Sequence, residues 1–72
     1  MDVGDVVVAN VIAIGADGHH SFMSVNNDKI TKPIIIKERL KFNETYKIEI
    51  INNATNFYIA KVIEKIEKEN DV

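Results

Sequence analysis

Two stretches of this sequence decide its fold: Val3–Gly18, VGDVVVANVIAIGADG, and Phe57–Glu64, FYIAKVIE. The first is a run of β-branched residues between two glycine-containing turns, which is typical of a strand. The second starts with two aromatic residues and has a small residue, Ala60, at its centre. Because a chain of 72 residues with only short apolar runs between these stretches can bury a core mainly by curling one sheet, we expect a single small β-barrel.

Three further strands are predicted between these stretches. His19–Val25 follows the first glycine turn, Pro33–Lys37 contains three consecutive isoleucines, and Glu44–Ile50 alternates between apolar and polar residues. Asn26–Lys29 reads as a turn, and residues 38–43 form a connection with room for one helical turn. We therefore predict an all-β fold, a five-stranded antiparallel barrel over residues 1–66, followed by a charged flexible tail over residues 67–72.

The alternation of side chains predicts which residues face the core. The first strand is apolar on both sides, with Val6, Val8, Ile12 and Ile14 on one face and Val7, Ala9, Val11 and Ala13 on the other. Tyr46 is expected in the core. In the last strand only one of Phe57 and Tyr58 can be fully inside. If Tyr58, Ala60 and Val62 point inward, then Phe57 and Ile59 are outside.

The last stretch also allows a helix. Its apolar residues Ile59, Val62, Ile63 and Ile66 recur at helical spacing. The β character of its aromatic start, and the need for a fifth strand to close the barrel, favour a strand from residue 56 to about residue 63. A short helical tail beyond Glu64 stays open as an alternative.

The charge is low overall and uneven along the chain. The net charge of −2 opposes nucleic-acid binding, for which proteins are usually basic. Residues 29–47, however, hold six lysines and arginines against two glutamates. Such a segment can place a positive face on an acidic protein, or it can be a solvated surface with chance clustering.

Several classes of protein find no support. The chain has no cysteine, which excludes disulfides, a thiolate zinc site and a cysteine nucleophile. The two adjacent histidines, His19 and His20, point opposite ways on a strand, so we predict no metal site. Without a catalytic motif, we expect neither an enzyme nor a cofactor. Without an apolar run of about 20 residues or a basic leader, we expect a cytoplasmic protein with no membrane partner.

Aromatic and basic residues together indicate a binding surface. Aromatic rings stack on bases and lysines contact phosphates, which is how proteins bind single-stranded nucleic acid. The predicted RNA-binding residues are Phe22, Lys32, Lys37, Arg39, Lys41, Lys47 and Phe57. The alternative for Phe57 is packing under a loop.

Four motifs resemble the TRAM domain, an OB-like barrel found beside tRNA-modifying enzymes and as stand-alone archaeal proteins. They are VGDV at residues 3–6, IGADG at residues 14–18, the isoleucines 34–36 followed by FNETYKI at residues 42–48, and FYIAKVIE at residues 57–64. Asn43 stands where the family usually has glycine, and asparagine tolerates the positive φ of such a turn. The resemblance implies an OB-like fold, RNA binding, an exposed Phe57, and Lys37, Arg39 and Lys41 in the same region.

These observations predict a small RNA-binding barrel protein that binds RNA or tRNA weakly, with little sequence preference, in the manner of an RNA chaperone. The alternative is a protein-interaction module or accessory subunit that binds no nucleic acid. Outward Phe57 and Ile59 would then contact a protein partner or a second copy of the chain.

Overall fold

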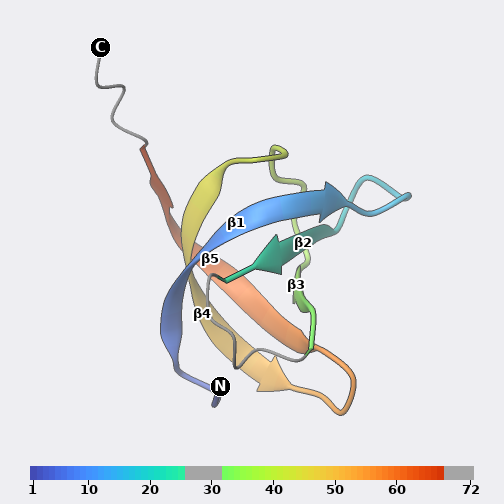
Figure 1. Cartoon of the computed structure of the whole chain (residues 1–72). Coiled ribbons are helices and arrows are strands. Elements are labelled where there is room, and N and C mark those ends of the chain that lie inside the picture. The colour runs from blue at the N-terminus through green and yellow to red at the C-terminus, as the bar shows by residue number, and fades with distance from the viewer. Residues whose placement is uncertain (26–31, 68–72) are drawn as a thin grey trace.

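The computed structural model describes residues 1–25 and 32–67, and its strands form one ring (Figure 1). The strands are β1 (Val6–Ile14), β2 (Ser21–Ser24), β3 (Ile34–Ile36), β4 (Thr45–Asn53) and β5 (Tyr58–Ile66). The predicted turn at residues 26–29 and most of the predicted tail, residues 68–72, lie outside the described residues. The predicted all-β fold is confirmed, and the described residues contain no helix.

The sheet closes in the order β1-β2-β3-β5-β4, with β4 paired to β1. Four of the pairs are antiparallel, whereas β3 and β5 are parallel. A barrel with an odd number of strands cannot alternate direction all round, so one parallel pair is unavoidable. The closed five-stranded barrel is therefore as predicted and compatible with an OB-like barrel, and only the purely antiparallel arrangement is wrong.

The core follows the alternation of the strands. The buried apolar residues are Ala9, Val11, Met23, Ile34, Ile36, Tyr46, Ile48, Ile50, Tyr58 and Ala60. Tyr46, Tyr58 and Ala60 point inward as predicted. Because every strand contributes to this one cluster, burial of its side chains holds the ring closed.

Three irregularities in the pairing each leave one isoleucine without a partner and exposed: Ile12, Ile51 and Ile63. Each extra residue reverses the alternation beyond it. Ile14 therefore packs against the core, and its predicted place on one face with Val6 and Val8 is wrong. The extra Ile63 also explains the helix-like spacing in a segment that is strand from Tyr58 to Ile66.

The connection from β3 to β4 crosses one end of the barrel without a helical turn. Ser21 fixes it: its fully buried hydroxyl donates to the carbonyl oxygen of Glu38 at 2.7 Å and accepts the N–H of Leu40 at 2.9 Å. Leu40 packs against the core from this end. Two residues before β4, Asn43 has a φ of 70°, a left-handed conformation that asparagine tolerates.

Candidate functional site

Three half-buried apolar side chains form a row on the outside of the barrel. Phe22 of β2 is opposite Ile35 of β3, and Ile35 is opposite Ile59 of β5. Each lies between two residues whose side chains are buried in the barrel, so all three point outward. We call the surface around this row the β2–β3–β5 face.

Two lysines follow the row on the same face. Lys37 comes two residues after Ile35, and Lys61 comes two residues after Ile59. Lys37 directly follows Ile36, which is paired with Ala60, the residue before Lys61, so both lysines lie at the same end of the β3–β5 pair. Both are exposed. The ammonium group of Lys61 is 3.8 Å from the Glu49 carboxylate, an exposed ion pair that holds it weakly.

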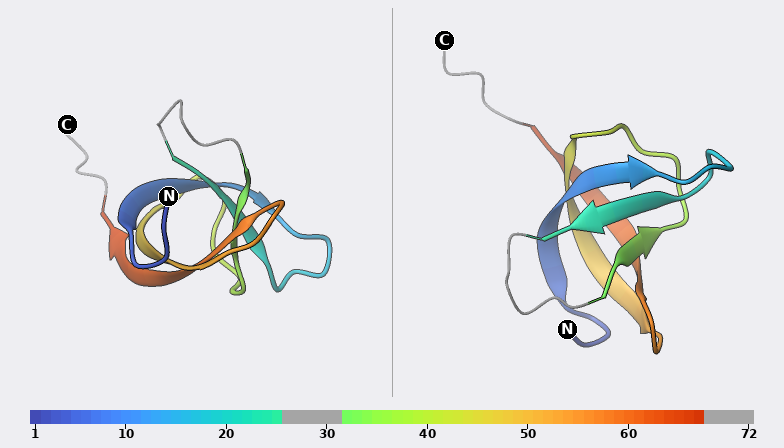
Figure 2. Two further views of the ribbon diagram at one scale, coloured as in Figure 1. Left: turned by 90° about the horizontal axis from the view of Figure 1, so that it is seen from below. Right: turned by 45° about the vertical axis from the view of Figure 1, so that its right-hand side comes forward.

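Two turns border this face (Figure 2). In the right-hand view β2 and β3 lie in front, with the β1–β2 turn above them and the β4–β5 turn below. Phe57 is in the lower turn, just before β5, and is half-buried, with its carbonyl oxygen accepting the N–H of Ala54 at 3.0 Å. The outer faces of two strands and two turns thus meet on one side of the barrel.

The upper turn holds a histidine and a carboxylate in contact. Nδ1 of His20 lies 2.7 Å from Oδ2 of Asp17, and Oδ1 of Asp17 accepts the backbone N–H of His19 at 2.9 Å. The hydrogen bond from the His19 backbone, together with the His20 side chain, holds the pKa of the Asp17 carboxyl below its usual value of 3.8. Asp17 is therefore ionised at neutral pH.

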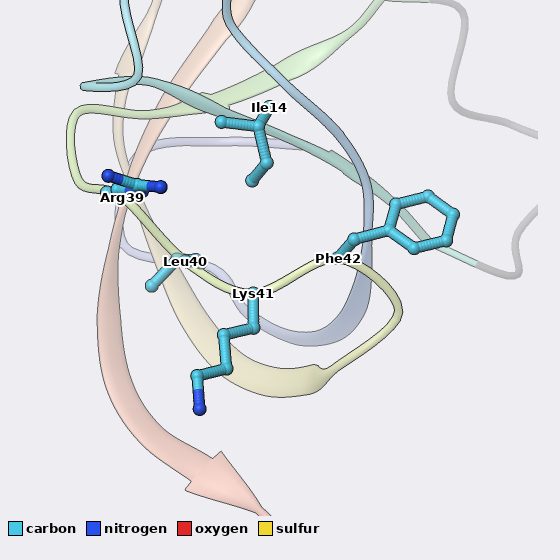
Figure 3. A pocket seen from close by; sticks show the side chains of 5 residues that line it. All are labelled: Ile14, Arg39, Leu40, Lys41 and Phe42. Atoms are coloured by element: carbon cyan, nitrogen blue, oxygen red, sulfur yellow. The ribbon is translucent and has the colours of Figure 1, made fainter.

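The end of the barrel carries an open pocket of about 570 Å³ (Figure 3). Ile14 at the end of β1 and residues 39–42 line it. The pocket brings together two of the predicted basic residues, Arg39 and Lys41. Phe42, which is 67% exposed, turns its ring away from the pocket centre.

Two predicted lysines lie elsewhere. Lys47 is on the outside of β4, with its ammonium group 4.0 Å from the Glu64 carboxylate. Lys32 donates to the side-chain oxygen of Asn53 at 2.5 Å and to the carbonyl oxygen of Ala54 at 2.7 Å. Its ammonium group also lies 4.4 Å from the ring centre of Tyr58. Through these contacts, Lys32 stabilises the β4–β5 turn.

A further ionic cluster joins Glu44, just before β4, to the end of β5. Lys65 donates to the Glu44 carboxylate at 2.5 Å, and the hydroxyl of Tyr46 donates to it at 3.1 Å. The hydrogen bond from Lys65 lowers the pKa of Glu44 and raises that of Lys65. Burial, followed by the Glu44 carboxylate, raises the pKa of Tyr46. This cluster ties the strand ends together.

The structure thus divides the predicted residues among several places. Phe22 and Lys37 share the β2–β3–β5 face with Phe57 at its border, and Arg39 and Lys41 line the pocket. Lys32 is bound within the β4–β5 turn at that border, and Lys47 is on the outside of β4. Sequence reasoning missed Ile35, Ile59 and Lys61 as members of the face. The alternation within each strand was enough to predict that these side chains point outward. Only the pairing of β3 with β5 brings them together.

Within the described residues, no group of three or more histidines and carboxylates could hold a metal ion, and no helix could span a membrane. No family model, curated protein or solved structure matches this chain. The likeness to TRAM domains therefore stays a prediction, and functional inference has to start from the β2–β3–β5 face.

Proposed function

We propose that the β2–β3–β5 face binds single-stranded RNA with little sequence preference. The single observation that carries the proposal is the register that aligns Phe22, Ile35 and Ile59, at whose end Lys37 and Lys61 follow the last paired residues, Ile36 and Ala60. Bases would stack on the ring of Phe22 and rest on the two isoleucines, while the lysines would meet phosphates. The resemblance to TRAM domains implies the same class of ligand.

The acidic total charge fits weak binding. The face holds two exposed lysines, and Arg39 and Lys41 at the barrel end can extend the track to further phosphates. For single strands, each neutralised phosphate contributes a slope of about −0.7 in a plot of log affinity against log salt. Two to four contacts therefore give a slope of roughly −1.5 to −3. Phe57, at the border of the face, would stack on a further base.

The test is a titration with a fluorescent oligouridylate at low and moderate salt. Phe22→Leu keeps an apolar side chain but removes the ring. Stacking contributes about 1–3 kcal/mol per base, and because leucine keeps part of the contact we expect the lower end of this range, a roughly five- to tenfold fall in affinity. Lys37→Gln should lower affinity and make the salt slope shallower by about 0.7. Lys47→Gln removes an equal charge outside the face and is the matched control.

Two results contradict the proposal. One is the absence of binding at low salt. The other is an equal loss of affinity in Lys37→Gln and Lys47→Gln, because a diffuse positive field, and not this face, would then attract the RNA.

A second candidate, an interface between protein molecules, is favoured by the outside of β1. Val6 and Val8 point outward there and are 47% and 52% exposed. The neighbouring side chains of β4 and β5 alternate in sign, so a second copy could match them: Lys47, Glu49, Lys61 and Glu64. Sedimentation of the protein and of Val8→Lys tests this candidate. A concentration-dependent dimer lost in Val8→Lys supports it, and a monomer at all concentrations refutes it.

A further inference from the structure

The Asp17–His20 contact fixes the hydrogen on the histidine ring. A carboxylate only accepts hydrogen bonds, so the 2.7 Å contact between Asp17 Oδ2 and His20 Nδ1 requires the hydrogen on Nδ1. In the neutral ring, the lone pair is then on Nε2. His20 thus holds a hydrogen-bond acceptor at a defined place, with a side chain that is 40% exposed.

The backbone of the β1–β2 turn holds Asp17 and His20 close together. The N–H of Gly15 donates to the carbonyl oxygen of His20 at 2.8 Å, and the N–H of Gly18 donates to the carbonyl oxygen of Gly15 at 2.9 Å. A Cβ at Gly15 would lie 3.2 Å from Asp17 Oδ1 and 3.3 Å from the Cβ of His20. The side chains of Asp17 and His20 therefore pack against Gly15 so closely that a larger residue there would displace them.

The pair belongs to the border of the β2–β3–β5 face. Ala13 is opposite Phe22, and two residues further along the hairpin Gly15 is opposite His20. His20 consequently lies on the same side of β2 as Phe22, next to it on that face. Lys37 follows Ile36, the partner of Ser21, so His20 and Lys37 both lie at this end of the β2–β3 pair.

We propose that Nε2 of His20 accepts a hydrogen bond from the ribose 2′-hydroxyl of a nucleotide whose base stacks on Phe22, so that this residue selects RNA over DNA. The inference rests on the proposed function. The lysines of the face contact phosphates, which RNA and DNA share, and a stacked base is also common to both. The 2′-hydroxyl is the group that differs, and the lone pair on Nε2 of His20 can accept its hydrogen.

The experiment compares oligouridylate with oligodeoxyuridylate of equal length, which differ only in the 2′-hydroxyl. We expect the wild type to prefer the ribose form roughly three- to tenfold, the effect of one net hydrogen bond. His20→Ala should bring the ratio close to one by weakening only the ribose complex. His19→Ala, the adjacent histidine, should keep the ratio, and His20→Gln, whose amide oxygen can accept, should restore part of it.

Nitrogen NMR of the free wild-type protein checks the ring independently of any variant, because the hydrogen must be found on Nδ1. Three results overturn the inference. The first is a ring hydrogen found on Nε2 of neutral His20. The others are an unchanged ratio of RNA to DNA affinity in His20→Ala, or an equal loss of the RNA preference in His19→Ala. If both oligonucleotides bind equally through Phe22 and Lys37, only the role of His20 falls. If neither binds, the proposed function falls with it.

Discussion

Removal of one buried hydroxyl should loosen the end of the barrel that carries Arg39 and Lys41. Ser21 is fully buried and holds both the carbonyl oxygen of Glu38 and the N–H of Leu40. The substitution Ser21→Ala keeps the strand and the volume of the core, but it leaves these two backbone groups without a partner.

The size of the effect follows from the two bonds. At about 1 kcal/mol net for each hydrogen bond, the free energy of unfolding should fall by about 2 kcal/mol. For a domain of this length, 1 kcal/mol changes Tm by about 4–8 °C, so Tm should fall by roughly 8–16 °C. That is a large share of the modest stability expected of so small a barrel.

Urea unfolding at neutral pH measures the change, with Ser24→Ala as the matched control. Ser24 is in the same strand, but its side chain is exposed. We expect the control to stay within about 0.5 kcal/mol of the wild type. Hydrogen exchange should also accelerate at the amide of Leu40 in Ser21→Ala. The reasoning is refuted if the two variants are equally stable, or if the amide of Leu40 keeps its protection.

Three other predictions concern single positions. Because the folded state lowers the pKa of Glu44 below 4.5, the Glu44–Lys65 contact stabilises the fold above about pH 4.5 and loses this contribution as the pH falls through the lowered value. Urea unfolding should therefore find Glu44→Gln less stable than the wild type at pH 6, with the difference shrinking as the pH is lowered below 4.5, and a constant difference would contradict the assignment. At the positive φ of Asn43, thermal melts should show Asn43→Gly within about 0.5 kcal/mol of the wild type and Asn43→Ala about 1 kcal/mol less stable; equal melts would refute the role of φ. Lys32→Ala should lose about 1 kcal/mol of stability, because its bonds hold the β4–β5 turn, and should leave RNA affinity within about twofold; a loss of affinity as large as in Lys37→Gln would instead make it a ligand contact.

Local patterns were sufficient where a strand is regular. Tyr46, Ile48 and Ile50 alternate with polar residues, and the structure buries all three. The same rule failed at Ile14, because nothing in the sequence marks the extra residue at Ile12 that reverses the alternation. An irregularity in pairing depends on the partner strand, which a local pattern does not contain.

The candidate site shows the same limit. The sequence identified Phe22 and Lys37 as residues of the right chemistry, and it grouped Lys32 with them because both lysines are in the basic segment. In the structure, Lys32 is bound to Asn53 and Ala54 and has another task. Lys32 and Lys37 are close in the sequence, but they do not form one binding surface.

The sequence by itself determined that this chain forms strands and closes them around one core, because β-branched residues and turns follow one another in segments too short for any other core. Only the tertiary structure decided that β3 pairs with β5, which brings Ile35 beside Ile59 and places Lys37 and Lys61 at the same end of the pair. The physical reason is that closing the ring joins strands more than twenty residues apart, and this long-range pairing is set by the packing of the whole core.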